Sequence, residues 1–325
     1  MDNTLADIAG LAVGHATDLA LGSGVTVILF DRPAVASVCA LGGAPGGRDT
    51  DLLAPERSVE RIDAVVLSGG SAYGLDAAGG VQAWLRSQGR GAVFAGQLVA
   101  LVPQAILFDL ANGGDKDWGR FSPYRDLGWM AAAQAGGAVA LGSVGAGTGA
   151  STATCKGGLG SASAVTSAGH RVAAIVAVNA MGSPTIGSGR HFWAAPFEVA
   201  GEFGGLGWPA AITPADVVLR AKGLDAPATT IGLVATDATL TKAQAHRLAV
   251  MAHDGLARAI LPAHAPMDGD TMFAASTERR ALGDAAELLE LGHCAALAMA
   301  RAIARGVFEA TRLPHPGAQP AWRDL

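Results

Sequence analysis

The stretch Ala228-Thr-Thr-Ile-Gly-Leu-Val-Ala235 joins a Pro-containing loop, residues 224–227, to an apolar run that predicts a buried strand. It places a threonine hydroxyl at a loop-to-strand junction. If the peptide bond before Thr229 breaks, that residue carries both a nucleophilic hydroxyl and a base, its own freed α-amine. On its own the pattern is usually structural, so the surrounding residues decide between the two interpretations.

The composition predicts a soluble globular protein. Of the 325 residues half are hydrophobic, only 16% are charged and 45 are glycine, which suits closely packed layers with many tight turns. The net charge of −5, without a Lys/Arg cluster, argues against a nucleic-acid partner. Cys39, Cys155 and Cys294 are widely spaced, which fits a reducing compartment and neither a disulfide framework nor a zinc site. The acidic N-terminus and the absence of an apolar run approaching about 18 residues predict no signal peptide and no membrane span. We therefore expect a cytoplasmic protein.

Several apolar runs predict the elements around the opening stretch. Strands are expected at residues 25–30, 64–67 and 173–178, the first of them ending in a loop at 31–33. Helical spacing is present at 75–86, and a capping box formed by Thr241 and Gln244 opens a helix that runs to Ile260 and buries Leu248 and Met251. Residues 286–308 read as a second apolar helix or a helix pair. Without a linker or repeat, the chain reads as a mixed α/β or α+β domain.

The glycine-rich segment 142–160 does not meet the requirements of a nucleotide-binding loop. A Walker loop needs glycine directly before its lysine, whereas Cys155 precedes Lys156. Gly145, Gly147 and Ala150 match the looser dinucleotide spacing, but the Ser/Thr/Gly run that follows is a poor helix. A flexible loop is favoured. Lys156 within it either is a solvated surface lysine or sits desolvated, with a lowered pKa, as a donor to a developing oxyanion.

Three further positions allow both a functional and a structural interpretation. Asn179 ends the predicted strand 173–178 and is either a turn former or an oxyanion donor, which would be worth roughly 3 kcal/mol of barrier. Asp268 and Asp270 follow His264 and could ligate a metal with it, orient an ammonium, share a proton, or simply form an Asp-Gly turn. Ser71 follows a strand as a nucleophile elbow would, but the required second glycine is replaced by Tyr73, which favours a turn with a buried tyrosine.

Six ordered blocks resemble one family over nearly the whole chain, the L-aminopeptidase/D-esterase (DmpA-type) self-processing peptidases, which include β-aminopeptidases and nylon-oligomer hydrolases. The blocks are Leu41-Gly-Gly-Ala-Pro-Gly46 with Arg48-Asp-Thr-Asp-Leu-Leu53, Leu67-Ser-Gly-Gly-Ser-Ala-Tyr-Gly-Leu-Asp76, Pro103-Gln-Ala-Ile-Leu-Phe-Asp109, Thr229-Thr-Ile-Gly232 with Ala235-Thr-Asp-Ala238, Met251-Ala-His-Asp-Gly255 and Asp268-Gly-Asp-Thr-Met-Phe-Ala274.

The resemblance implies a single domain, residues 1–325, with the layered α-β-β-α sandwich of the N-terminal-nucleophile hydrolases. It also implies self-cleavage between Ala228 and Thr229 into chains 1–228 and 229–325, and a homo-oligomer, for example a tetramer. The family usually has Asn or Gly where this chain has Ala228. Ornithine acetyltransferases, which share the fold class, cut an Ala-Thr bond.

By the same resemblance Thr229 is the nucleophile of an aminopeptidase or amidase that acts on small amides, peptides or esters. Lys156 supports its hydroxyl, Asn179 stabilises the oxyanion, and Asp268 and Asp270 hold the amine; no cofactor and no metal are implied. Tyr73 and Phe108 are expected to contact substrate, although some nylon-hydrolysing relatives carry tyrosine at the second position.

Three alternatives stay open at this point. The same site could serve as a nylon-oligomer endo-hydrolase or as an acyltransferase, in which an amine replaces water as the acceptor. A metal-dependent hydrolase could use His264, Asp268 and Asp270. A scaffold that keeps the fold would never cleave itself.

Overall fold

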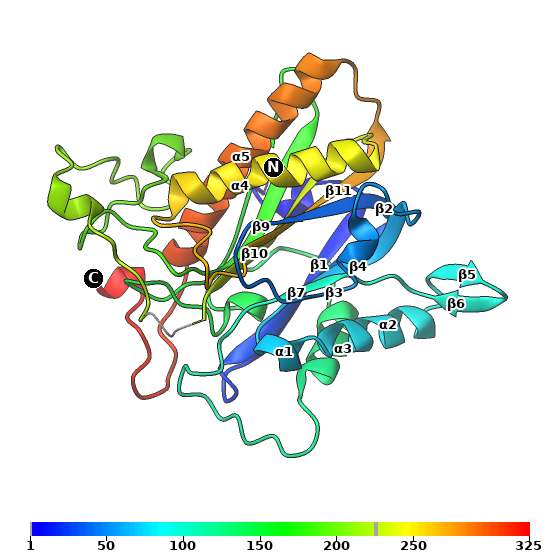
Figure 1. Cartoon of the computed structure of the whole chain (residues 1–325), viewed down its shortest axis with the longest axis horizontal. Coiled ribbons are helices and arrows are strands. Elements are labelled where there is room, and N and C mark those ends of the chain that lie inside the picture. Colours follow the sequence, from blue (N-terminus) through cyan, green and yellow to red (C-terminus); the bar gives the residue numbers. More distant parts are fainter. Residues whose placement is uncertain (1, 224–226) are drawn as a thin grey trace.

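The computed structural model describes residues 2–223 and 227–325, so most of the predicted loop 224–227 lies outside the described residues. Within that part of the chain, nine strands form one mixed sheet, ordered β3-β7-β4-β2-β11-β10-β9-β8 with β1 paired to β2 (Figure 1). These strands are β1 (Leu11–Asp18), β2 (Ser23–Ala40), β3 (Gly47–Arg48), β4 (Arg61–Ser68), β7 (Gln104–Ile106), β8 (Leu159–Val165), β9 (Arg171–Asn179), β10 (Thr229–Ala238) and β11 (Thr271–Arg280). A separate two-stranded ribbon, β5 (Ala92–Phe94) and β6 (Gln97–Val99), projects from the body (Figure 1).

The helices cover the two outer faces of this sheet (Figure 1). They are α1 (Ser71–Gly74), α2 (Ala77–Ser87), α3 (Tyr124–Ala133), α4 (Lys242–Ala259) and α5 (Ala285–Phe308). Short 3-10 turns lie at η1 (Leu5–Asp7), η2 (Asp51–Leu53), η3 (Gly145–Gly147), η4 (Ala195–Phe197), η5 (Pro214–Val217) and η6 (Trp322–Asp324). Among the described residues no helix is both long enough and apolar enough to span a bilayer.

Alternating side chains along the strands divide the interior into three cores. Successive residues of a strand point to opposite faces. Val27 of β2 accordingly packs with α2 and α3, whereas the next residue, Ile28, packs into a central core. On β10, Leu233 enters that central core and Val234 enters a third core beneath α4 and α5. Two halves of the sheet therefore face each other between two helical layers, which confirms the predicted α-β-β-α sandwich.

The long strand β2 corrects one prediction, because residues 31–33 continue the strand where the sequence predicted a loop. The pairing of β2 with β4 shifts register between Leu29 and Ala34; within this irregularity Phe30 is buried, and residues 31–33 are exposed. Pro33 lacks an N–H and is tolerated at such an irregularity. Beyond it, β2 pairs with β11, so the strand links the two halves of the sheet.

The predicted helices are present with small shifts in their ends. The Thr241–Gln244 capping box is formed, and Leu248 and Ile260 are buried, whereas Met251 is only partly so. Residues 285–308 form one helix rather than a pair. This helix packs so closely on β8 that an added Cβ at Gly160 would lie 1.8 Å from the Ala302 carbonyl oxygen.

Tyr73 corrects another prediction, since its side chain is 57% exposed and rests edge-on against Trp118. The buried tyrosine is Tyr124. It fills the space beside Gly70, whose φ of 88° suits glycine and where a Cβ would meet the tyrosine ring at 2.2 Å. The ring of Tyr124 therefore occupies the space beneath the turn at Gly70, and the side chain of Tyr73 points outward.

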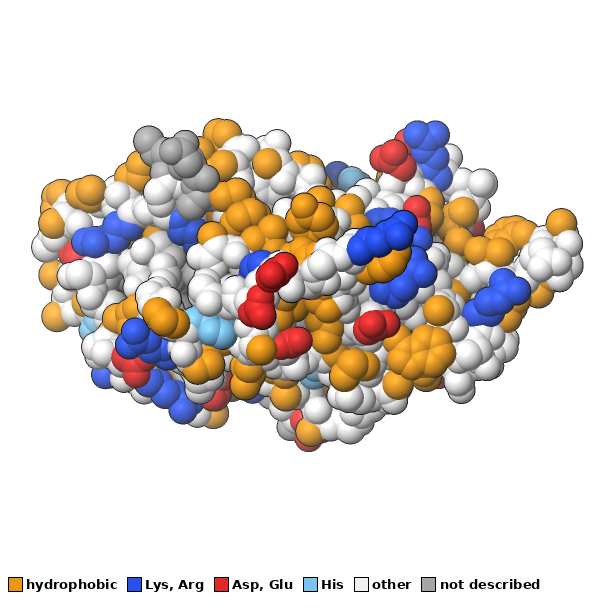
Figure 2. All heavy atoms as spheres, turned by 90° about the horizontal axis from the view of Figure 1, so that it is seen from below, with side chains coloured by type: hydrophobic (Ala, Val, Ile, Leu, Met, Phe, Trp, Pro, Cys, Tyr) orange, Lys and Arg blue, Asp and Glu red, His pale blue; other side chains and the backbone are white. Residues whose placement is uncertain are grey.

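On the face shown in Figure 2, basic and acidic side chains are interspersed with apolar ones, and charges of neither sign form an extended patch.

Candidate active site

Thr229 is the first residue of β10, and three chain segments meet at this end of the strand. Its partner across the antiparallel ladder is Asn179, the last residue of β9. The parallel neighbour β11 starts just after Asp268, which bridges to Ala228. The start of β10, the end of β9 and the start of β11 lie side by side at the same end of these three strands. The sheet therefore brings together residues that are far apart in the sequence. Thr229 is buried there, with 5% of its surface exposed.

The carbonyl oxygen of Ala228 accepts two hydrogen bonds. The backbone N–H of Gly269 donates to it over 2.9 Å, and the hydroxyl of Thr229 also donates to it at short range. Gly269 allows this approach because it lacks a side chain; a Cβ there would lie 2.6 Å from Thr229 Oγ1. The hydroxyl thus sits beside the carbonyl it would attack, and a fixed N–H is already placed on the carbonyl oxygen.

Asp270 contacts the backbone of Thr230, the residue that follows Thr229. Its Oδ1 accepts the backbone N–H of Thr230 at 2.8 Å, and its Oδ2 accepts the backbone N–H of His264 at 3.0 Å. The Nδ1 atom of His264 is 2.8 Å from the same Oδ2. Asp270 is almost fully buried, so this carboxylate anchors the start of β10.

Asp268 is held by backbone N–H groups on both oxygens. Met181 donates to Oδ1 at 3.1 Å and Ala265 donates to Oδ2 at 3.0 Å. Burial, and then the nearby charge of Asp270, raise the pKa of Asp268 to about 6. The backbone of Asp268 bridges to Ala228, and the carboxylate of Asp270 contacts the residue that follows Thr229. That these two carboxylates would hold a freed amine stays a prediction.

Asn179 is fully buried and its amide orientation is determined by its neighbours. Its Oδ1 accepts the backbone N–H of Ser151 at 3.0 Å and the ammonium of Lys222 at 2.9 Å. Its Nδ2 is therefore the donor end, and it donates to the Phe108 carbonyl oxygen at 3.0 Å. The amide presents N–H groups on the side away from Lys222.

Lys222 is a residue that sequence reasoning missed. The only signal was the scarcity of lysine, since the chain has four. Burial lowers its pKa to about 7, while the charge of Asp268 acts in the opposite direction.

Lys156 is buried, which favours the desolvated lysine of the two alternatives left open by the sequence, but its contacts differ from those expected. In the described structure its ammonium donates to the carbonyl oxygens of Gly147 at 2.9 Å and Gly157 at 2.8 Å, and no hydrogen bond joins it to Thr229. Burial lowers the pKa of Lys156 to about 7, and Asp109 counteracts this shift. Lys156 therefore braces the glycine-rich loop in the uncleaved chain.

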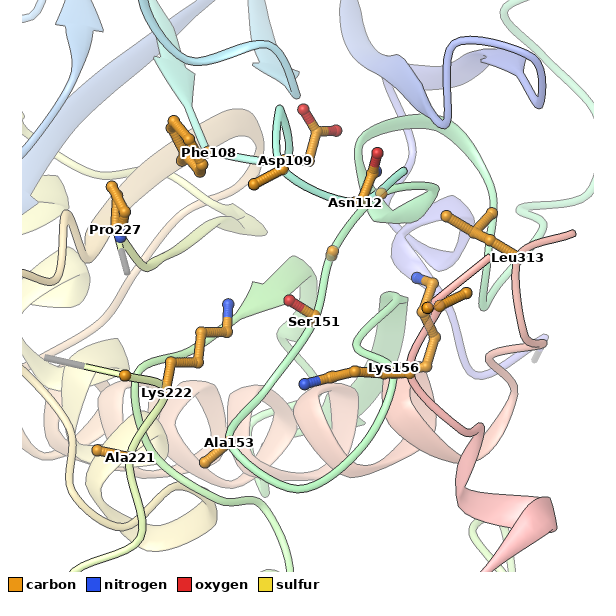
Figure 3. Close-up of a pocket in the computed structure, with 17 residues that line it drawn as sticks. Phe108, Asp109, Asn112, Ser151, Ala153, Lys156, Ala221, Lys222, Pro227 and Leu313 are labelled. Carbon is orange, nitrogen blue, oxygen red and sulfur yellow. The ribbon is translucent and has the colours of Figure 1, made fainter. Parts of the chain in front are cut away.

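A cavity of about 810 Å³ opens beside these residues (Figure 3). Phe108, Lys156 and Lys222 line it, whereas Tyr73 lies outside the lining; that Phe108 contacts substrate stays a prediction. The remaining lining residues are Asp109, Ala111, Asn112, Gly149, Ala150, Ser151, Ala153, Ala221, Gly223, Pro227, Leu313, Gly317, Ala318 and Gln319. Pro227, which lines the cavity, directly precedes Ala228 in the chain, whereas Ala228 and Thr229 are not lining residues.

The structure gives little support to the other chemistries weighed from the sequence. Gly145–Gly147 forms a single 3-10 turn that leads through a loop to β8, not the helix that a dinucleotide fingerprint opens. Nowhere in residues 2–223 and 227–325 are three His, Cys, Asp or Glu side chains grouped to hold a metal ion. His264, Asp268 and Asp270 are engaged instead in the hydrogen bonds described above.

The fold defines a class, because it is similar to that of two solved aminopeptidases, one of which is described as a variant of the Ntn hydrolase fold. A β-aminopeptidase from Burkholderia sp. superposes with a TM-score of 0.72 at 23% identity, covering 99% of this chain and 90% of the other. The L-aminopeptidase D-Ala-esterase/amidase of Ochrobactrum anthropi, described as a variant of the Ntn hydrolase fold, gives 0.73 at 21% identity, covering 98% and 91%.

The particular family follows from sequence comparison. Residues 3–319 match the model of peptidase family S58, and the chain belongs to that family. A protein described as an uncharacterized aminopeptidase of Mycobacterium tuberculosis is 41% identical over 350 residues, covering 99% of this chain and 98% of the relative. A similarly described protein of Mycobacterium leprae is 43% identical over 291 residues, covering 85% and 78%. The predicted family is thereby confirmed, and with it a peptide- or amide-hydrolysing class of enzyme.

Proposed function

We propose that this protein is a self-processing aminopeptidase or amidase that hydrolyses small amide, peptide or ester bonds through an acyl-enzyme on Thr229. The observation that carries the proposal is the geometry at Ala228. Its carbonyl group is held by the Gly269 N–H while the Thr229 hydroxyl lies against it.

Self-cleavage is the first reaction that this geometry supports. The Thr229 oxygen attacks the Ala228 carbonyl carbon, and the Gly269 N–H stabilises the charge that develops on the carbonyl oxygen. The C–N bond then breaks, and the hydroxyl proton passes to the departing nitrogen of Thr229. Water hydrolyses the resulting ester, which leaves a carboxylate on Ala228 and restores the threonine hydroxyl beside a free amine.

Turnover would then use the new N-terminus. The amine of Thr229, with an unperturbed pKa of about 8, takes the hydroxyl proton as the oxygen attacks a substrate carbonyl. Asn179 supports this step because its amide nitrogen faces away from Lys222, and only one of its two N–H groups is used by the Phe108 carbonyl oxygen, so the other would serve the oxyanion. Asp268 and Asp270 lie where they can orient the amine. The acyl-enzyme yields to water, or to an amine if the enzyme acts as a transferase.

Denaturing electrophoresis of wild-type protein beside Thr229→Ala and Thr230→Ala variants tests the proposal. At 32.5 kDa for 325 residues, cleavage before residue 229 gives fragments of about 23 and about 10 kDa. We expect both in the wild type and in Thr230→Ala, because the buried Thr230 hydroxyl has no hydrogen-bond partner among the described residues. Neither should form in Thr229→Ala. An uncleaved wild-type protein that still hydrolyses amides would overturn the proposal, and an uncleaved inactive one would indicate a scaffold.

A further inference from the structure

The cavity lies on the acyl side of the bond that Thr229 would attack. Pro227 lines the cavity and precedes Ala228, which supplies the first acyl group in the proposed self-cleavage. A substrate whose carbonyl replaces that of Ala228 therefore extends its acyl portion along the same wall. This step rests on the proposed function. The volume of about 810 Å³ falls in the range of small-molecule sites.

The described lining of this cavity carries an excess of positive charge. It contains two lysines but a single carboxylate, Asp109. The oxygens of Asp109 already accept hydrogen bonds from Ser23 Oγ at 2.7 Å and from the Gly70 N–H at 2.8 Å. Its charge also acts on Lys156 more strongly than any other charged group does. Among the lining residues that the structure describes, no uncommitted carboxylate is therefore present for an ammonium-bearing acyl group.

Neither of the two cavity lysines contacts an anion in the described structure: Lys156 donates to two carbonyl oxygens of the glycine-rich loop, and Lys222 to Asn179. The ammonium of Lys222 donates to two neutral acceptors of one residue, the Asn179 carbonyl oxygen at 3.2 Å and Oδ1 at 2.9 Å. A lysine ammonium has three N–H donors, so one remains. Figure 3 shows the side chain reaching into the cavity toward the hydroxyl of Ser151. No hydrogen bond of that hydroxyl is found within residues 2–223 and 227–325.

We propose that Lys222 and Ser151 form a carboxylate-binding subsite, and that the substrates are amides whose acyl portion carries a carboxylate. One carboxylate oxygen would accept the remaining N–H of Lys222 and the other the hydroxyl of Ser151. A buried ammonium without an anion is costly, and a charge-assisted hydrogen bond from the ligand offsets that cost. Phe108, Pro227 and Leu313 supply apolar contacts for the carbon chain between the carboxylate and the reacting carbonyl.

Two matched substrate pairs test the subsite. Glutamate p-nitroanilide is compared with glutamine p-nitroanilide, and glutaric acid mono-p-nitroanilide with the corresponding carboxamide. Within each pair only the carboxylate changes. We expect kcat/KM to favour the carboxylate by about tenfold or more, the size of a hydrogen bond to a charged group.

The variants are judged by this ratio and not by absolute rate, because Lys222 also holds Asn179. Lys222→Met should reduce the carboxylate preference to about one, and Ser151→Ala should reduce it partly. Lys242→Met is the matched control. This buried lysine likewise donates to two backbone carbonyl oxygens, those of Leu52 and Arg57, but lies outside the cavity, so the preference should persist.

Calorimetric titration with glutarate and with glutaramide separates failure of the subsite from failure of the proposed function. Glutarate binding that Lys222→Met abolishes, in a protein that hydrolyses neither pair, would support the subsite and contradict the function. Hydrolysis that requires Thr229 without preference for either member of a pair would overturn the subsite alone. Equal or undetectable binding of glutarate and glutaramide would also overturn it.

Discussion

At the scale of single residues, the contact between Gly269 and Ala228 would make the proposed self-cleavage depend on the absence of one methyl group. In Gly269→Ala the new Cβ would meet Thr229 Oγ1 at 2.6 Å and the Ala44 carbonyl oxygen at 2.8 Å. The hydroxyl must then move away from the carbonyl, so fragments should appear more slowly than in the wild type. A time course on denaturing gels measures this rate.

Gly189→Ala is the control for that substitution, because its Cβ would approach only the Ile186 carbonyl oxygen, at 3.4 Å. It should process like the wild type. Equal processing in all three proteins would contradict the role given to Gly269.

Asn179 allows a shape-preserving test of the oxyanion donor. Asn179→Asp keeps an oxygen for Lys222 and the Ser151 N–H but removes the amide donor. We expect kcat to fall about 10²–10³-fold, as when one oxyanion donor is lost. Steady-state kinetics measures this fall, and an unchanged melting temperature excludes unfolding as its cause. A variant as active as the wild type would remove Asn179 from the chemistry.

The pKa of Lys222 predicts how the carboxylate preference varies with pH. Burial lowers this pKa to about 7; the charge of Asp268 raises it, Lys156 lowers it, and Asp109 raises it again. Below about pH 7 the side chain is an ammonium that attracts a carboxylate, and above it a neutral amine. The ratio of kcat/KM within a matched pair should therefore fall as pH rises through and beyond 7. A ratio independent of pH from 6 to 9 would contradict this assignment.

The resemblance to the family named four residues that the structure brings together, but it did not name all of their contacts. Thr229, Asn179, Asp268 and Asp270 were predicted, and the strand ends bring them together. Lys222 could not be found from sequence, because its contact with Asn179 joins residues 43 positions apart and no local pattern marks it.

At the scale of elements, α4 depends on its first turn. The Thr241 hydroxyl accepts the Gln244 N–H, and the Gln244 side chain accepts the Thr241 N–H. Thr241→Ala should lower the free energy of unfolding by about 1 kcal/mol, the usual loss at an N-cap. Urea denaturation followed by circular dichroism measures it. Since Thr241 lies outside the cavity, unchanged activity is expected; an unaltered midpoint would show that the cap contributes nothing.

Continuous apolar runs predicted the strands correctly, whereas the run interrupted by residues 31–33 led to the prediction of a loop inside β2. Buried strands 173–178 and 231–235 lie inside β9 and β10. The passage of β2 through Pro33 could not be predicted, because a proline after an apolar run normally ends a strand. On one side of β2 the pairing partner changes from β1 before Pro33 to β11 after it, while β4 pairs with the other side both before and after Pro33, and this makes the continuation possible.

At the scale of the whole molecule, the proposed cut falls at the end of a strand that is paired on both sides. β10 hydrogen-bonds with β9 of the large chain and β11 of the small chain, and its side chains enter two of the three cores. Cleavage before Thr229 leaves these contacts intact. Both fragments should therefore elute together in native size-exclusion chromatography and separate only under denaturing conditions. Separate elution of the small chain would contradict this architecture.

The central claim is that Thr229 becomes an N-terminus. Intact-mass spectrometry with N-terminal sequencing of active wild-type protein tests it most directly. We predict two chains, one of them beginning Thr229-Thr-Ile-Gly232, whose masses sum to the full chain plus one water. A single uncut chain in a preparation that hydrolyses amides, with activity retained in Thr229→Ala, would contradict the account.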